Sequence, residues 1–177
     1  MCIKIGLDVL WEEQVMLRIR EAEVEDLPEM LAIYNYAIKN WTATFDLEEQ
    51  TLDQRRIWFN LHGDEYPLIV AEVDGTVAGY CSLSPFKDKK AYEKTVEISI
   101  YLSEAYHGFG IGKKLMEEII SEAKQLNYHT IIAVITGGNK ASVKLHEKFG
   151  FEFAGCLKEV GYKFGEWLDV CYYQLRL

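Results

Sequence analysis

A glycine-rich segment in the second half of the chain carries the clearest chemical signal. Residues 107–112 read HGFGIG, and Lys113 and Lys114 follow at once. Glycines at alternate positions let a backbone turn tightly and approach a ligand closely. If a helix begins here, its free N–H groups and its dipole favour an anion such as a phosphate. We predict a phosphate-binding loop; the alternative is a plain structural turn.

Two familiar nucleotide-binding loops do not match this segment. A Walker A loop ends in Gly-Lys-Ser/Thr, whereas Gly112 and Lys113 are followed by Lys114. A dinucleotide-binding fold places its glycine loop after the first strand of a parallel βαβ unit. This loop instead follows a predicted antiparallel hairpin and lies past the midpoint of the chain.

A second candidate is Glu97, in the middle of the strand-like segment 95–102. The period of two in a strand places four polar or aromatic side chains on one face: Thr95, Glu97, Ser99 and Tyr101. A carboxylate inside a central strand is costly unless it has a partner or a function. In a partly apolar cleft its pKa rises and it can act as a general base. The alternative is a structural glutamate paired with Lys94 or Arg56.

The elements that must position these residues follow from periodicity and turn signals. Helices are expected from Asp26, from Thr51 to about residue 62, from Gly110, and over 139–149. Strands are expected over 17–20, 68–73, 77–83, 95–102, 130–135, 151–157 and 170–177. This order predicts an α/β fold in which one mixed sheet carries helices on both faces.

Length and composition narrow the class of protein. The 177 residues fit one domain, expected over 16–177, with residues 1–15 as an N-terminal extension. The net charge of −9 argues against a nucleic-acid partner. No apolar run approaches the roughly 20 residues needed to cross a membrane, and early charges such as Lys4 and Asp8 interrupt any secretory signal. We expect a cytoplasmic protein with no membrane partner.

The four cysteines do not form a metal-binding pattern. They have no CxxC spacing and no clustered histidines, so no metal is expected; they are Cys2, Cys81, Cys156 and Cys171. The last three lie in apolar, strand-like runs and are expected to be reduced core residues.

The glycine loop resembles the pyrophosphate loop of the GNAT acetyltransferase superfamily, whose pattern is Gln/Arg-x-x-Gly-x-Gly/Ala. His107 stands where that family usually has Gln or Arg. The resemblance covers almost the whole chain from Met16. It implies a GNAT-like acyl-CoA N-acyltransferase fold with a mostly antiparallel central sheet, acetyl-CoA as the acetyl donor, and acetylation of an amine.

Three further segments resemble the phosphinothricin N-acetyltransferase branch of that superfamily. They span residues 92–102, Asn139 with 145–151, and 161–170, of which the last is the most specific. The resemblance implies a small amino-acid-like acceptor, such as phosphinothricin or methionine sulfoximine, and a homodimer.

The same resemblance implies roles for individual residues. Glu97 is implied as the base, and His146 stands where many members carry a Tyr that protonates the leaving thiolate. A lone His beside apolar side chains is equally expected to be a core residue. The implied cofactor-binding residues are Ile100, Tyr101, Leu102, His107, Gly108, Phe109, Gly110, Ile111, Gly112, Lys113, Asn139 and Ser142. For Asn139, a plain helix cap is the alternative.

The acceptor side is less specific in the sequence. The expected substrate-binding residues are Phe45, Phe86, Lys87 and Tyr92, with the aromatic rings as walls and the lysine for an acidic group. Trp167 and Tyr162 are candidates for completing the pocket across a dimer interface. Three other functions stay open: acetylation of a protein N-terminus or polyamine, a non-catalytic acyl-CoA sensor, and a nucleotide-binding regulatory domain.

Overall fold

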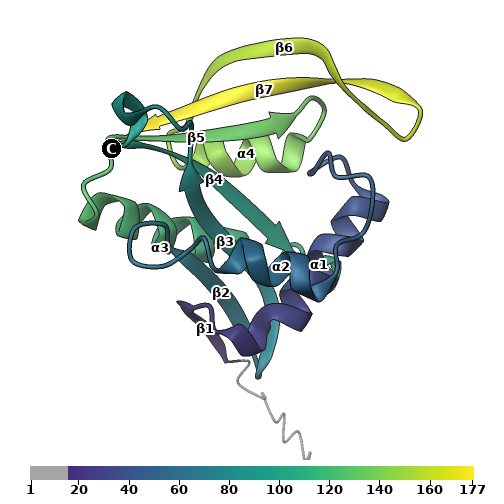
Figure 1. Cartoon of the computed structure of the whole chain (residues 1–177), viewed down its shortest axis with the longest axis vertical. Coiled ribbons are helices and arrows are strands. Elements are labelled where there is room, and N and C mark those ends of the chain that lie inside the picture. The colour runs from purple at the N-terminus through teal and green to yellow at the C-terminus, as the bar shows by residue number, and fades with distance from the viewer. Residues whose placement is uncertain (1–15) are drawn as a thin grey trace, which may run out of the picture.

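A computed structural model describes residues 16–177, so the expected extension over 1–15 lies outside the described residues. The strands are β1 Leu17–Glu21, β2 Leu68–Val73, β3 Thr76–Pro85, β4 Thr95–Leu102, β5 Thr130–Thr136, β6 Glu152–Lys163 and β7 Glu166–Arg176 (Figure 1). The α-helices are α1 Leu27–Asn40, α2 Leu52–Phe59, α3 Ile111–Gln125 and α4 Lys140–Lys148. Short 3-10 helices span Val24–Asp26, Lys90–Tyr92 and Glu104–Tyr106.

The strands form one mixed sheet in the order β1-β2-β3-β4-β5-β7-β6. Every neighbouring pair is antiparallel except β4 and β5, which are parallel. A parallel pair needs a crossover, and the segment containing α3 supplies it between these two strands. The predicted mixed, mostly antiparallel sheet is therefore confirmed.

Helices cover both faces of this sheet, as predicted. The larger apolar cluster joins α3 to the sheet and includes Val96 and Ile98 of β4. The smaller cluster joins α1 to the opposite face, where Tyr101 of β4 packs against it. The alternation along β4 thus turns Glu97 and Tyr101 away from the α3 side.

Capping and turn signals placed most element boundaries correctly. Thr51 and Gln54 form the expected capping box at the start of α2. The Asp74-Gly75 turn joins β2 to β3, and both residues have positive φ. These signals act within a few residues, which explains why a sequence pattern can report them.

The last two strands are longer than predicted, which corrects the expected ends at Leu157 and Val170. Lys163 pairs with Glu166, so β6 and β7 meet in a two-residue turn at Phe164 and Gly165. Both turn residues have positive φ, 53° and 83°, as a tight hairpin turn requires. Figure 1 shows this hairpin projecting from the edge of the sheet.

Two cysteines form a disulfide, so the expectation that they are reduced was wrong. Cys156 on β6 and Cys171 on β7 are register partners, with Cα atoms 4.0 Å apart, and their sulfurs are bonded. Cys81 is buried and free. Strand register places the two bonded side chains opposite each other, and their spacing of 15 residues carries no such signal.

Candidate active site

The glycine-rich loop leads into the start of α3 with unpaired main-chain donors. Gly108 and Gly110 have φ of 86° and 80°, and Gly110 is the N-cap of α3. The first main-chain bond of the helix runs from the Lys113 N–H to the Gly110 carbonyl over 3.1 Å. Within residues 16–177, no amide of residues 108–112 donates a hydrogen bond. Free amides at a helix N-terminus form a site suited to a pyrophosphate.

Gly112 has a packing role in this loop. A Cβ at this position would lie 3.2 Å from Leu102 and 3.4 Å from Leu145 side-chain carbons. Glycine therefore lets the first turn of α3 approach the end of β4 and the middle of α4. This contact brings the loop close to the carboxyl end of β4.

The flanking side chains of the loop make contacts of their own. His107 lies against Trp41, with ring centroids 5.2 Å apart. Lys113 Nζ lies 3.2 Å from Glu117 Oε1 and is half-exposed. Because the unpaired amides belong to the main chain, the loop keeps its donors even though His107 replaces the usual Gln or Arg of the pattern.

An opening in the sheet lies beside this loop. The pairing of β4 with β5 ends at Ile98 and Ala133, although the strands continue to Leu102 and Thr136. Figure 1 shows the two strands diverging toward their carboxyl ends. Among the described residues, the β5-facing main-chain groups of β4 beyond Ile98 therefore have no strand partner. An extended ligand can bind such an edge by adding hydrogen bonds of the β type.

Glu97 lies just before this opening. It is a half-buried residue opposite Ser84 on β3 and Ile132 on β5. No cation within the described residues lies within 4 Å of its carboxylate, so the suggested pairing with Lys94 or Arg56 is absent from residues 16–177. Burial raises the pKa of Glu97. A half-buried carboxylate with a raised pKa is suited to accepting a proton.

His146 lies on α4, the helix that follows β5. It is 3% exposed, and its Nδ1 lies 2.8 Å from the Ser142 carbonyl oxygen. A carbonyl only accepts, so Nδ1 carries the hydrogen and Nε2 keeps its lone pair. The ring packs edge-on against Phe151 at 5.0 Å, and burial lowers the pKa of His146. The side chain is therefore neutral at pH 7.

This buried neutral histidine predicts a loss of stability in acid. Because folding lowers the pKa of His146 below 6.5, the unfolded chain binds more protons as the pH falls through that value. The free energy of unfolding should then decrease, by at most about 1.4 kcal/mol per pH unit for one group. His62, whose pKa burial also lowers, adds to the same slope.

Denaturant unfolding at pH 7.5 and 5.5 measures this loss. We expect a smaller difference between the two pH values in His146→Gln than in the wild type. The exposed His129 provides the control, and His129→Gln should retain the wild-type difference. Equal differences in all three proteins would contradict the prediction.

Asn139 is the N-cap of α4 and keeps free donors. Its Oδ1 accepts the Ser142 N–H at 3.1 Å, so the cap expected as one alternative is present. The Nδ2 group makes no hydrogen bond within residues 16–177. A helix cap and a ligand contact are therefore compatible at Asn139, because the cap uses the side-chain oxygen and leaves the amide hydrogens for a ligand.

The structure brings three of the four expected acceptor residues together. Phe86 and Tyr92 meet edge to face at 5.8 Å, and Lys87 Nζ lies 5.0 Å and 5.5 Å from their ring centroids. Phe45 lies apart from them in the described contacts and packs on Gly161, where a Cβ would overlap its ring. It thus belongs to the contact between the loop after α1 and the β6–β7 hairpin.

Sequence reasoning missed the contacts that hold the loop after α1. Lys163 Nζ donates to the Thr44 carbonyl at 2.7 Å, and Thr136 Oγ1 donates to the Thr42 carbonyl. These partners are 119 and 94 residues apart in the chain. No local pattern reports such pairs, although the turn at Gly165 was a signal for the hairpin that carries Lys163.

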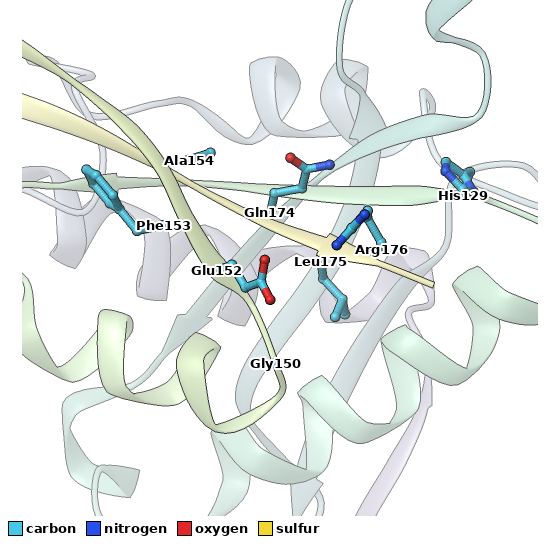
Figure 2. Close-up of a pocket in the computed structure, with 8 residues that line it drawn as sticks. All are labelled: His129, Gly150, Glu152, Phe153, Ala154, Gln174, Leu175 and Arg176. Carbon is cyan, nitrogen blue, oxygen red and sulfur yellow. The ribbon is translucent and has the colours of Figure 1, made fainter.

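Two hollows lie in the surface of the described residues, one near the carboxyl end of β4 and one near the start of β5. One of about 190 Å³ lies between α1 and the end of β4, and its lining includes Tyr36, Leu102 and Glu104. A larger one of about 550 Å³ lies at the opposite end of β5 (Figure 2). Its lining residues come from the start of β6, the end of β7 and the residues before them: His129, Gly150, Glu152, Phe153, Ala154, Gln174, Leu175 and Arg176.

Comparison with known proteins identifies the family of this chain. The family model described as "Acetyltransferase (GNAT) domain" matches residues 19–172. This chain belongs to the GNAT acetyltransferase family. It is 40% identical over 161 residues to the L-methionine sulfoximine/L-methionine sulfone acetyltransferase of Pseudomonas aeruginosa, covering 90% of this chain and 94% of that protein. The phosphinothricin N-acetyltransferase of Streptomyces viridochromogenes is 35% identical, with coverage of 92% and 88%.

A solved structure of this family contains the donor. The Sinorhizobium meliloti phosphinothricin acetyltransferase in complex with AcCoA superposes with a TM-score of 0.88 at 36% identity, covering 91% of this chain and 88% of that one. The expected fold, the acetyltransferase activity and acetyl-CoA as donor are confirmed.

The GNAT acetyltransferase has the groups that acetyl-CoA requires. The unpaired amides of residues 108–112 suit its pyrophosphate, and the free edge of β4 suits its extended pantetheine arm. When bound, acetyl-CoA supplies a thioester whose carbonyl carbon is open to attack by an amine. Within residues 16–177, no group of three His, Cys, Asp or Glu side chains is placed to hold a metal ion. No helix in this part of the chain combines the length and apolarity needed to span a membrane.

Proposed function

We propose that this GNAT acetyltransferase acetylates the α-amine of a small amino-acid-like acceptor, such as methionine sulfoximine, methionine sulfone or phosphinothricin. The names of relatives at 35–40% identity support this acceptor class. The observation that carries the proposal is Glu97, a half-buried carboxylate with no cation of residues 16–177 within 4 Å, just before the opening between β4 and β5.

In this proposal Glu97 prepares the acceptor for attack. An amino acid carries an ammonium at neutral pH, which has no lone pair. Glu97 accepts one of its protons, directly or through a water, so that the neutral nitrogen can bond to the thioester carbon. The amides of residues 108–112 and main-chain groups of β4 hold the donor, and an amide near Leu102 stabilises the developing charge on the carbonyl oxygen.

His146 is the second proton-handling group of the proposal. Its Nδ1–H is held by the Ser142 carbonyl, so Nε2 has a lone pair. Nε2 accepts the second proton that the attacking nitrogen loses and gives it to the coenzyme A sulfur as the bond between that sulfur and the carbonyl carbon breaks. Asn139 and Ser142 position α4 beside the donor and offer polar groups at its first turn. Phe86, Lys87 and Tyr92 form one wall of the acceptor pocket, and Phe45 contributes from the loop after α1.

An acceptor screen with a thiol-release assay tests the function. Purified enzyme and acetyl-CoA are mixed with methionine sulfone, methionine sulfoximine, phosphinothricin, a polyamine and a peptide with a free N-terminus. We expect fast release only with the three amino-acid-like compounds. Faster release with the polyamine or the peptide would contradict the acceptor class, and no release with any amine would favour a sensor that only binds acyl-CoA.

We also propose that two chains pair through the β6–β7 hairpin. Large apolar side chains on this hairpin are 50–63% exposed: Phe153, Leu157, Val160, Tyr162, Phe164 and Trp167. Such a cluster on one projecting element is typical of a protein interface. The partner hairpin would then border the acceptor pocket, with Trp167 and Tyr162 as the candidates for completing it.

If two chains pair through this hairpin, making the hairpin polar should shift the protein from dimer toward monomer. Replacing Trp167 by Ser removes an exposed aromatic anchor, so we expect the dimer dissociation constant to rise at least about 10-fold. Sedimentation equilibrium measures it. Ile57→Ser on α2, 68% exposed, is the matched control and should leave the mass unchanged. A monomeric wild type at all concentrations would refute the pairing.

Two further parts of the proposal concern the chain and its location. We propose that residues 16–177 are sufficient for activity, because the family match lies within them. We propose a cytoplasmic location, since acetyl-CoA is supplied there. The Cys156–Cys171 disulfide would be unusual in a reducing compartment, so cell fractionation is the appropriate test.

A further inference from the structure

Lys163 is a buried ammonium with unused hydrogen-bond donors. It is the last residue of β6, and only 3% of it is exposed. Its Nζ donates to the Thr44 carbonyl at 2.7 Å and lies 5.0 Å from the Phe164 ring centroid. An ammonium has three N–H groups, and within residues 16–177 only this one hydrogen bond is formed. No carboxylate of the described residues lies within 4 Å of it.

Asp46, whose charge acts on this ammonium, does not pair with it. The charge of Asp46 acts on Lys163 and opposes the fall in pKa that burial causes. However, Asp46 Oδ2 already accepts from Tyr34 and from Gln50, each at 2.9 Å. A buried charge is costly unless another group compensates it. Lys163 therefore lacks a full partner among residues 16–177.

The loop after α1, to which Lys163 donates at Thr44, also contacts the ends of β4 and β5. The preceding carbonyls of the same loop accept from Tyr101 of β4, at 3.4 Å, and from Thr136 of β5. These two residues lie near the ends of the diverging strands. Tyr101 shares its face of β4 with Glu97. The ammonium is thus on the same side of the sheet as the proposed base.

We propose that Lys163 binds an acidic oxygen group of the acceptor, its carboxylate or its phosphinate, and so selects amino-acid-like acceptors over plain amines. This inference rests on the proposed function. Binding uses the two free N–H groups and supplies the negative charge that the ammonium lacks. The exposed Lys87, which lies over Phe86 and Tyr92, is the rival cation for this role.

The experiment compares acceptors that differ only in charge. The first pair is L-methionine sulfone and its primary amide, which lacks the carboxylate. The second pair is phosphinothricin and methionine sulfone, which differ in the charged phosphinate. In the wild type we expect kcat/KM to be about 100-fold higher for the charged member of the pair that Lys163 recognises. In Lys163→Met this preference should fall to a few-fold, while the KM for acetyl-CoA stays unchanged.

Matched variants separate recognition from loop anchoring. Lys163→Arg keeps a positive hydrogen-bond donor and should keep most of the preference. If Lys163 only anchored the loop, this substitution would not be expected to preserve the preference. Lys158→Met, on the same strand with an exposed side chain, should behave as the wild type. Lys87→Met should leave the preference intact, and its loss there would assign the role to Lys87. Thermal unfolding of each variant reports whether it folds.

Three further results would overturn the inference. If Lys163→Met lowers kcat/KM equally for all acceptors, the residue only anchors the loop. If the wild type acetylates the amide as fast as the acid and shows no preference for the phosphinate, Lys163 does not bind an acidic group of the acceptor. The acetyltransferase function stands in that case. If the wild type acetylates none of these acceptors, the proposed function fails and this inference fails with it.

Discussion

Glu97→Gln should lower kcat by about 100- to 10,000-fold, the range that a lost general base produces. The substitution keeps the size and one oxygen of the side chain but removes its ability to accept a proton. Because Glu97 lies before the opening and does not contact the glycine loop, we expect acetyl-CoA affinity to change little. Steady-state kinetics with the best acceptor and a binding titration with acetyl-CoA measure the two effects.

The pH dependence of Glu97→Gln provides a second measure. The base works only when deprotonated, so wild-type kcat/KM should rise with pH through the raised pKa of Glu97. This rise should disappear in Glu97→Gln. Glu118→Gln, at an exposed position on α3, is the control and should keep both the rate and the rise. Equal turnover of wild type and variant, or a rise with pH that is the same in Glu97→Gln as in the wild type, would refute the assignment.

Gly110→Val should weaken acetyl-CoA binding by about 10- to 100-fold, the effect of losing one hydrogen bond to a charged group. Gly110 has φ of 80°, a conformation that a β-branched residue resists. The substitution therefore shifts the amides of the loop away from the pyrophosphate. It also adds side-chain atoms where the ligand approaches. Calorimetric titration of the variant with acetyl-CoA measures the change.

Gly75 provides a matched control for this substitution. Its φ is 82°, and like Gly110 it has no heavy atom within 4 Å of the position a Cβ would take. Gly75→Val should lose about as much stability as Gly110→Val, roughly 1 to 2 kcal/mol, but should bind acetyl-CoA as the wild type does. Unchanged affinity in Gly110→Val, with both variants folded, would mean that the loop does not hold the pyrophosphate.

Much of the donor side could be predicted from sequence because its determinants are local. The glycines that allow positive φ, the helix they begin and the alternation around Glu97 all act within about ten residues. The cap at Asn139 is local as well. Each of these features is set by backbone geometry between neighbours, so a pattern of residue types is enough to indicate it.

The acceptor side depended on contacts that no local pattern encodes. The sequence suggested Lys87 for an acidic group, and the structure adds Lys163, whose only hydrogen bond within the described residues is to a carbonyl 119 positions away. Phe45 belongs with the hairpin rather than in contact with Phe86 and Tyr92. The disulfide between Cys156 and Cys171 likewise depended on strand register.

The amino-acid sequence by itself determined the order of elements, the glycine-rich turn that begins α3 and the position of Glu97 within β4, since these depend on steric and hydrogen-bonding preferences of adjacent residues. Only the tertiary structure decided where β4 and β5 separate, which side chains hold the loop after α1, and which cations remain unpaired. Those outcomes depend on how distant segments pack together. Burial then sets the free energy of each charge, and it left Lys163 without a carboxylate partner among the described residues.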